Sequence, residues 1–341
     1  MPPVSSFRAT LQPSGHSFEL DGDTTVLEAA LDAGLTLPYG CRNGACGACK
    51  GKILEGTVDH GQAQETTLPD AERKAGMALF CCAKPLSDLV LEVREVSAAK
   101  DIPVRILPCR VQQVQRAADD VIILSLKLPV NERLQFLAGQ YIEFLLKDGK
   151  RRAFSIANAP HDDGFLQLHI RHVPGGEFTG HVFGAMKEKD ILRFQGPYGS
   201  FFLREESKKP MILVAGGTGF APIKSLVEHA IHQGITRPME LYWGARDRAG
   251  LYLPELPPAW TREHAHVRYV PVLSDATPGD AWEGRTGFVH RAVLEDHPDL
   301  AAYQVYACGA PAMIDAARAD FTAAGLPAEE FFADSFSFAA P

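Results

Sequence analysis

Cysteines are the residues in this sequence best suited to chemistry, and most of them cluster near its N-terminal end. Three follow the spacing Cys41-x4-Cys46-x2-Cys49, and the adjacent Cys81 and Cys82 come later. This spacing is typical of the thiolates of a [2Fe–2S] cluster, in which four sulfurs hold two irons, and Cys81 or Cys82 would supply the fourth. A zinc site or a redox dithiol can also use a Cys-x2-Cys pair, but a zinc site usually combines two such pairs. We therefore predict a [2Fe–2S] site.

Small residues surround these cysteines. Gly40, Gly44 and Gly47 alternate with Ala45 and Ala48 along the loop. Glycine adopts the unusual backbone dihedrals that wrapping a cluster requires. The amide N–H groups of such a loop can point at the sulfurs and stabilise the more negative, reduced cluster. The composition of the loop thus agrees with the cysteine spacing.

The segment that closes this region, residues 81–88, resembles the corresponding segment of plant-type ferredoxins. In that family the last ligand precedes a proline by four positions, and Cys81 stands in that relation to Pro85. The resemblance covers residues 6–96 and implies a β-grasp domain in which Cys82 is a bystander. It implies the metal ligands Cys41, Cys46, Cys49 and Cys81.

A second segment, Arg152-Ala153-Phe154-Ser155, ends a β-like run. An arginine fork matches a phosphate, and an aromatic face can stack on a flat ring system. The segment is similar to the flavin signature of the ferredoxin–NADP reductase superfamily, with phenylalanine where tyrosine is common. The resemblance implies FAD rather than FMN, with the Ser155 hydroxyl at flavin N5. It also implies cofactor contacts from His169, Ile170, Arg171, Gly176 and Thr179.

A third segment, residues 211–222, has the pattern of an apolar strand, a glycine turn and a helix start. The turn is Gly216-Gly217-Thr218-Gly219. A helix N-terminus offers N–H donors and a partial positive charge to a pyrophosphate. The turn differs from the G-x-G-x-x-G fingerprint but resembles the nicotinamide loop of the same superfamily. A Cys-Gly-x-Pro-x-Met element resembles the one that lies beside the nicotinamide, and it implies roles for Cys308, Gly309 and Met313.

Two further predictions concern coenzyme choice and the flavin face. Asp247 can accept from a ribose 2′-hydroxyl and would repel a 2′-phosphate, whereas Arg246 and Arg248 could pair with that phosphate. We favour NADH over NADPH. In related reductases an aromatic residue near the C-terminus covers the flavin, and Phe336 is our candidate. Core packing is the competing interpretation for Phe336, as it is for Cys308.

The elements that must position these motifs fall into three regions of a multidomain α+β and α/β protein. We expect a ferredoxin domain over 1–97, a linker over 98–104, an antiparallel flavin barrel over 105–206 and a parallel-sheet nicotinamide domain over 207–341. In the first region, Asp23 or Thr24 is the expected cap of a helix. In the second, turn residues separate short β-like runs, which is the pattern of an antiparallel barrel or sandwich. In the third, strands alternate with helices, which predicts a parallel sheet covered on both faces.

Composition excludes several classes of function. A formal net charge of −8 argues against nucleic-acid binding, which needs a basic face. No stretch approaches the roughly 18 apolar residues of a membrane span, and residues 1–10 lack the apolar run of a secretory signal. We expect a cytoplasmic protein whose thiols stay reduced.

The order of the three regions resembles that of the single-chain reductases that serve bacterial oxygenases, and more closely that of the CDP-6-deoxy-glucoseen reductase type. The resemblance implies that NADH reduces FAD and that electrons pass through the cluster to a partner, an oxygenase or a sugar dehydrase. Two alternatives stay open. One is a stand-alone NAD(P)H flavin reductase or diaphorase with an auxiliary cluster. The other is a non-catalytic ferredoxin-type docking module.

Overall fold

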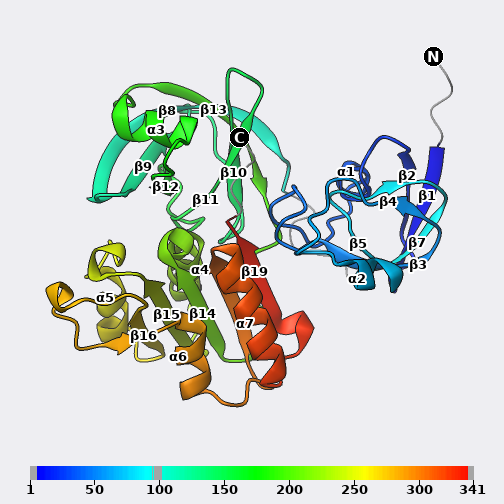
Figure 1. The fold of residues 1–341 in the computed structure, drawn as a ribbon. Helices are drawn as coiled ribbons and strands as arrows, with labels where there is room; N and C mark the ends of the chain where they lie inside the picture. Colours follow the sequence, from blue (N-terminus) through cyan, green and yellow to red (C-terminus); the bar gives the residue numbers. More distant parts are fainter. Residues whose placement is uncertain (1–5, 94, 96–101, 337–341) are drawn as a thin grey trace. The chain divides into compact units, whose positions relative to one another are not determined.

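The computed structural model describes residues 6–93, 95 and 102–336, which fall into two compact units that divide after Pro103 (Figure 1). Residues 98–101 of the expected linker lie outside the described residues, and residues 102–104 have no regular structure. Among the described residues, none of the helices has the length and apolar character of a membrane span.

The first unit is a five-stranded sheet of order β2-β1-β7-β3-β5 with helix α1 packed beside β2. Strand β1 pairs antiparallel with β2 and parallel with β7. Alternation along β1 buries Ala9 and Leu11 and leaves their neighbours partly or fully exposed, as expected for a strand with one buried face. Its elements are β1 (Ser6–Gln12), β2 (Ser17–Asp21), α1 (Val26–Asp32), β3 (Lys50–Glu55), β4 (Val58–Asp59), α2 (Asp70–Lys74), β5 (Met77–Leu79), β6 (Lys84–Pro85) and β7 (Leu89–Glu92).

The expected cap of α1 was wrong by one residue. Thr25 is the N-cap, and its side chain forms a capping box with Glu28. Asp23 and Thr24 instead belong to the preceding turn, where their amides donate to the Asp21 carboxylate at 2.9 and 2.7 Å. The helix therefore starts after that turn.

The second unit begins with an antiparallel sheet of order β11-β10-β13-β8-β9-β12. A bridge between Ile156 and Leu168 joins its two ends, so the sheet closes into a barrel rather than a sandwich. The long strand β8 pairs with β13 through its first half and with β9 through its second. The elements are β8 (Arg105–Ala118), β9 (Val121–Lys127), β10 (Tyr141–Leu145), β11 (Arg151–Ser155), β12 (Leu166–Arg171), α3 (Glu177–Gly184) and β13 (Ile191–Tyr198).

The same unit continues into a six-stranded sheet of order β17-β16-β15-β14-β18-β19, in which every pairing is parallel. Helices α4 and α5 contribute to one hydrophobic core and α6 and α7 to another (Figure 1), which confirms a parallel sheet covered on both faces. The elements are β14 (Met211–Gly216), η2 (Gly217–Gly219), α4 (Phe220–His232), β15 (Met239–Ala245), η3 (Arg248–Gly250), α5 (Leu256–Glu263), β16 (Val267–Leu273), η4 (Pro278–Asp280), β17 (Arg285–Thr286), α6 (Val289–Asp296), β18 (Gln304–Gly309), α7 (Pro311–Ala323), η5 (Ala328–Glu330) and β19 (Phe331–Ser335).

Candidate functional site

The loop between α1 and β3 and the segment after β5 bring the predicted thiols together in two pairs. Cys41 and Cys46 lie within hydrogen-bonding range of each other, and so do Cys49 and Cys81. The amide N of Cys41 lies 3.3 Å from Sγ of Cys46, and the reverse distance is also 3.3 Å. Within residues 6–93, 95 and 102–336, no three His, Cys, Asp or Glu side chains converge as one metal ion would require. Two thiol pairs fit two irons, each bound by two sulfurs, better than they fit one zinc ion.

Within each pair, the hydrogen bond between the two sulfurs lowers the pKa of one cysteine and raises the pKa of its partner, Cys46 or Cys49. The Cys46 thiol donates to the Cys41 sulfur and lowers the pKa of Cys41 to about 6. The Cys49 thiol does the same for Cys81, with help from the Cys82 thiol and the Gly44 amide, and the pKa of Cys81 falls to about 4. Thiolates are the metal-binding form of cysteine. The set of four cysteines, arranged as two pairs, therefore fits a [2Fe–2S] cluster, which would bind all four as thiolates.

Cys82 packs beneath the loop. Its Sγ lies 3.7 Å from that of Cys81 and is buried. A Cβ on Gly44 would lie 2.8 Å from the Cys82 sulfur and 3.1 Å from Cα of Ala63, so only glycine fits there. Gly44 also has a φ of +78°, which glycine adopts at little cost. Because Cys82 also lies within hydrogen-bonding range of Cys81, its role as a bystander stays a prediction from the ferredoxin resemblance.

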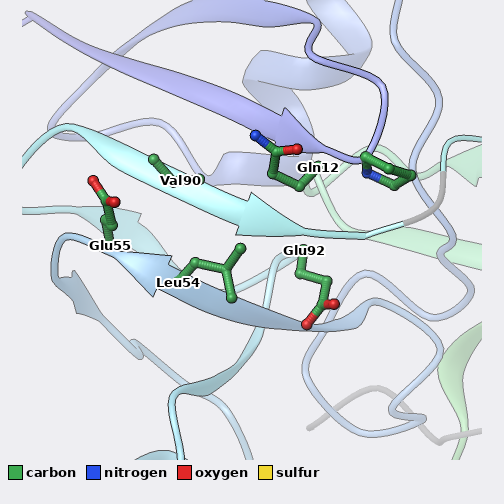
Figure 2. Close-up of a pocket in the computed structure, with 6 residues that line it drawn as sticks. Gln12, Leu54, Glu55, Val90 and Glu92 are labelled. Carbon is green, nitrogen blue, oxygen red and sulfur yellow. The ribbon is translucent and has the colours of Figure 1, made fainter.

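A surface groove at the far end of this sheet is separate from the cysteines. It is lined by β1, β3 and β7 residues, with Leu54 and Val90 side chains on neighbouring strands and Glu55 and Glu92 among the other residues that line it (Figure 2). The groove contains no thiol, and Leu54 lies near the end of β3, whereas the cysteine loop leads into its start at Lys50. The residues that line the groove are therefore different from those of the candidate site.

Three side chains converge where the barrel meets the parallel sheet. Ser155, at the end of β11, donates to Oδ2 of Asp334 at 3.4 Å. The parallel register of β18 and β19 pairs Asp334 with Cys308. All three residues are buried. Burial, reinforced by Asp334, raises the pKa of Cys308 well above its usual value, so its side chain is a neutral thiol and not a nucleophilic thiolate.

Asp334 was missed by the sequence reasoning, which named Ser155, Cys308 and Phe336 at this point. The sequence feature that could have indicated it is an acidic residue inside the otherwise mostly apolar run Phe331–Ser335. In the structure Asp334 is only 7% exposed. Burying a carboxylate is costly, so a buried one usually has a specific partner. Phe336 follows at the same edge, where its amide donates to the Gly309 carbonyl at 2.9 Å.

The other residues of the flavin motif lie along β11. The Phe154 ring packs against Phe144 and Phe178, with centroids 5.8 and 5.4 Å apart. The Arg152 guanidinium donates from Nη1 to the Arg151 carbonyl at 2.8 Å. A guanidinium has several N–H donors, so this bond is compatible with the predicted phosphate contact. Ala153 is exposed between them.

The glycine and threonine of the predicted pyrophosphate contact lie at the start of α3. Gly176 is the N-cap. The Thr179 hydroxyl accepts from the Val173 amide at 3.1 Å and lies 3.3 Å from the Val173 carbonyl, to which it can donate. A hydroxyl held in this local turn is not the free donor that the resemblance implied. The predicted pyrophosphate contact of Gly176 and Thr179 would therefore be made by the backbone N–H groups of the first turn of α3.

Arg171 offers buried donors at the junction of the two nucleotide segments. Its Nη1 lies 3.2 Å from the Asp120 carboxylate, while Nε and Nη2 are buried with no protein acceptor. Nη2 lies 3.3 Å from where a Cβ on Gly217 would be. Unsatisfied buried donors are costly, and a guanidinium suits a phosphate. Arg171 therefore fits an anionic cofactor group, whereas the side chain of its neighbour Ile170 lies in the barrel core.

The glycine turn after β14 packs directly on the end of β18. A Cβ on Gly219 would lie 2.1 Å from the Cys308 carbonyl oxygen, and one on Gly216 would lie 2.6 Å from Sδ of Met313. A Cβ on Gly309 would lie 2.8 Å from Cε of Met313. The structure thus brings together the two elements predicted to bind the nicotinamide, which are distant in the sequence, and this close approach requires glycine.

Two of the three side chains considered for coenzyme choice take part in local structure. The Asp247 carboxylate accepts from the Gly250 amide at 2.9 Å and caps η3. The Arg248 guanidinium donates to the Asp280 carbonyl at 3.3 Å. The preference for NADH stays a prediction that depends on the negative charge of Asp247.

His169 is a buried titratable group between the barrel and the parallel sheet. Its Nδ1 lies 2.8 Å from the Tyr252 hydroxyl and its Nε2 lies 3.3 Å from Oε1 of Gln167. Because an amide oxygen only accepts, Nε2 carries the proton and Nδ1 accepts from Tyr252. Burial, with a smaller effect of Lys224, lowers the pKa of His169 to about 3. The ring is therefore neutral at physiological pH.

We expect His169 to destabilise the second unit in acid. The unfolded chain binds a proton at its ordinary pKa of 6.5, and the folded chain binds it only near 3, so stability falls as the pH drops through this window. Between pH 7 and 5 the loss is about 2 kcal/mol of unfolding free energy. His169→Gln should remove this pH-dependent part. Urea unfolding at pH 7 and 5, followed by tryptophan fluorescence, measures it, because all three tryptophans lie in this unit.

The control for this experiment is His181→Gln, which changes an exposed histidine of α3. It should keep the wild-type difference between the two pH values. If His169→Gln keeps that difference too, the assignment of a depressed pKa to His169 is wrong.

Comparison with known families accounts for all three parts of the site. Residues 9–86 match the 2Fe-2S iron-sulfur cluster binding domain. Residues 108–203 match the oxidoreductase FAD-binding domain, and residues 213–319 match the oxidoreductase NAD-binding domain. These matches confirm the three predicted cofactors.

Similarity extends over the whole chain. The CDP-6-deoxy-L-threo-D-glycero-4-hexulose-3-dehydrase reductase of Yersinia pseudotuberculosis is 43% identical over 97% of this chain and 98% of its own length. The reductase component of phenol 2-monooxygenase from a Pseudomonas species is 37% identical over 98% of this chain and 96% of its own. The crystal structure of a cytochrome P450 reductase from Amycolatopsis matches with a TM-score of 0.78 at 35% identity, covering 97% of this chain and 98% of that one.

A [2Fe–2S]-binding domain, an FAD-binding barrel and an NAD-binding sheet in one chain define an iron–sulfur flavoprotein oxidoreductase. The chain belongs to the family of iron–sulfur flavoprotein reductases, whose members include the reductase components named above. It transfers electrons from NADH through FAD to a [2Fe–2S] centre for an electron-accepting partner protein. The predicted fold class and reductase activity are confirmed.

Proposed function

We propose that hydride transfer takes place beside Ser155, Cys308 and Asp334. The observation that supports this is the convergence of the three buried side chains where the barrel meets the glycine turn of the parallel sheet. Bound FAD supplies the chemistry that accepts two electrons from NADH and releases them one at a time. The residues of the chain position the reactants and exclude water from them.

Each residue has a distinct part in this proposal. Asp334 accepts a hydrogen bond from the Ser155 hydroxyl and fixes its orientation. When FAD is bound, this hydroxyl would lie beside flavin N5. Cys308 is a small neutral thiol that shapes the nicotinamide side of the site, and Phe336 covers the flavin face. The cofactor phosphates are bound by guanidinium groups and by backbone amides at the starts of two helices. These phosphate contacts come from Arg152, Arg171, Gly176, Thr179, Gly216, Gly217, Thr218 and Gly219.

The cluster is bound by Cys41, Cys46, Cys49 and Cys81, and it gives electrons to the partner. We place the domains at 1–97, 105–206 and 207–341, and the three larger sheets and the three family matches support this division. We place the protein in the cytoplasm, where thiols stay reduced.

The partner that we propose first is a dehydrase that acts on a CDP-linked deoxy sugar. The relative at 43% identity is named as the reductase of such a dehydrase, and the phenol 2-monooxygenase component is 37% identical over a similar share of both chains. An oxygenase is the second candidate. The difference in identity is the observation that orders the two.

An anaerobic absorbance experiment tests this proposal in two stages. Adding NADH to the purified protein should bleach the flavin band and the cluster band together. Adding an oxidised CDP-hexulose dehydrase with its sugar substrate should then restore the cluster band, whereas a phenol hydroxylase oxygenase should restore it more slowly. If the protein contains zinc, or if the iron stays oxidised while the flavin bleaches, the electron path is wrong. Faster reoxidation by the oxygenase would reverse the order of the partners.

A further inference from the structure

Trp243 lies directly against the nucleotide turn. It belongs to β15, is 0% exposed, and its Nε1 donates to the Gly217 carbonyl at 3.0 Å. The indole N–H is the one polar group of a tryptophan side chain, and a buried one needs an acceptor. Here the acceptor belongs to the turn that forms the start of α4.

The indole is held rigidly in this position. Its ring stacks on Phe220 with centroids 3.8 Å apart and an interplanar angle of 9°. Tyr252 packs edge-on against it at 5.2 Å and 87°. Because Phe220 is the first residue of α4, the same ring contacts the helix and hydrogen-bonds to the turn that precedes it. A side chain packed on two sides fixes the direction of its hydrogen bond.

The hydrogen bond from Trp243 to the Gly217 carbonyl determines the direction in which the next amide of the turn points. The Gly217 carbonyl accepts from Trp243 and also from the Phe220 amide, which uses both of its lone pairs. The C=O and N–H of a trans peptide point in opposite directions. A Gly217 carbonyl directed at the indole therefore directs the Thr218 N–H away from it. This N–H is one of those that have no acceptor within the helix itself.

We propose that Trp243 is a positioning residue for NADH: its indole N–H orients the Gly217–Thr218 peptide so that the Thr218 amide donates to the coenzyme pyrophosphate. The inference rests on the proposed binding of NADH at Gly216–Gly219. It adds a residue that does not touch the coenzyme and that no sequence motif indicated.

The test removes the N–H and keeps an aromatic ring. In the holoprotein, Trp243→Phe should bind NAD⁺ about threefold to tenfold more weakly, the range expected for one neutral hydrogen bond. The KM for NADH should rise by the same factor with kcat unchanged, because the contact is remote from the reacting atoms. Isothermal titration with NAD⁺ and steady-state kinetics measure the two quantities.

Trp260→Phe is the matched control, because Trp260 also packs on Phe220, at 6.1 Å, and lies in α5, away from the turn. It should bind NAD⁺ as the wild type does. If Trp243→Phe binds NAD⁺ like this control, or only lowers the thermal midpoint, Trp243 has a purely structural role and the proposal is wrong. A further variant, Gly217→Ala, strains a residue with a φ of +53° in the turn itself. Unchanged NAD⁺ binding in that variant would refute the proposed coenzyme site rather than the role of Trp243.

A measurement on the unmodified chain covers the case in which Trp243→Phe does not fold. The three indole N–H groups give three ¹⁵N-resolved resonances, which Trp260→Phe and Trp282→Phe assign by elimination. NAD⁺ should shift the Trp243 resonance more than the other two. A Trp243 resonance that NAD⁺ leaves in place would overturn the proposal.

Discussion

Replacing Cys46 with serine should reduce electron transfer to cytochrome c to the level of the buffer control, while NADH-dependent reduction of free flavin continues at the wild-type rate. Cys46 belongs to the thiol pair with Cys41, and each amide of that pair also donates to the other sulfur. If Cys41 and Cys46 bind the same iron as we propose, loss of one thiolate would leave that iron with a single protein sulfur, so the cluster should not assemble. The barrel and the parallel sheet form a separate compact unit and should keep FAD. Iron content and both activities are measured on the same preparation.

Cys82→Ala is the matched control for this variant. Cys82 is buried like Cys46, Cys49 and Cys81 and lies 3.7 Å from the Cys81 sulfur, but it is not one of the proposed ligands. It should keep its iron and its cytochrome c activity. Iron lost from Cys82→Ala would show that the fourth ligand is misassigned. Cytochrome c reduction that survives in Cys46→Ser would favour a diaphorase with an auxiliary cluster.

Replacing Ser155 with alanine should slow the reduction of FAD by NADH about a hundredfold, the effect typical of losing one preorganised hydrogen bond at a reacting centre. The hydroxyl is buried and oriented by Asp334, so water cannot readily take its place. The apparent affinity for NADH should change little, because Ser155 belongs to the barrel and the glycine turn to the parallel sheet. Stopped-flow absorbance at saturating NADH gives the rate constant directly.

Ser125→Ala tests whether any buried serine of the barrel has this effect. Ser125 is 8% exposed on β9 and has no part in the proposed site. It should reduce FAD at the wild-type rate. A Ser155→Ala variant that is as fast as Ser125→Ala would remove Ser155 from the proposed mechanism, and FAD content measured in parallel distinguishes slow chemistry from lost cofactor.

The features that the sequence by itself determined are those that depend on neighbours along the chain. The spacing of Cys41, Cys46 and Cys49 places three thiols on one short loop whatever surrounds it. The apolar run and glycine turn at residues 211–219 produce a strand, a tight turn and a helix because each conformation follows from local residue types. The parallel sheet followed from the same alternation of strands and helices.

Local patterns were less reliable where two polar groups compete for one turn. The N-cap of α1 is Thr25, and the amides of the two residues before it donate to the Asp21 carboxylate in a separate turn. The Thr179 hydroxyl bonds to Val173 instead of staying free. Both outcomes depend on backbone geometry at single residues, which residue types alone do not specify.

Tertiary structure alone decided which distant residues meet. Ser155 and Asp334 come from different sheets, and Asp334 reaches Cys308 only because β19 pairs with β18 in one particular register. Trp243 contacts the glycine turn because β14 and β15 lie side by side. A strand register or a side-chain contact between remote segments is set by the packing of the whole unit. For that reason the spacing of cysteines and glycines along the chain indicated its cofactors, whereas only the folded structure shows how the groups that would act on them are arranged.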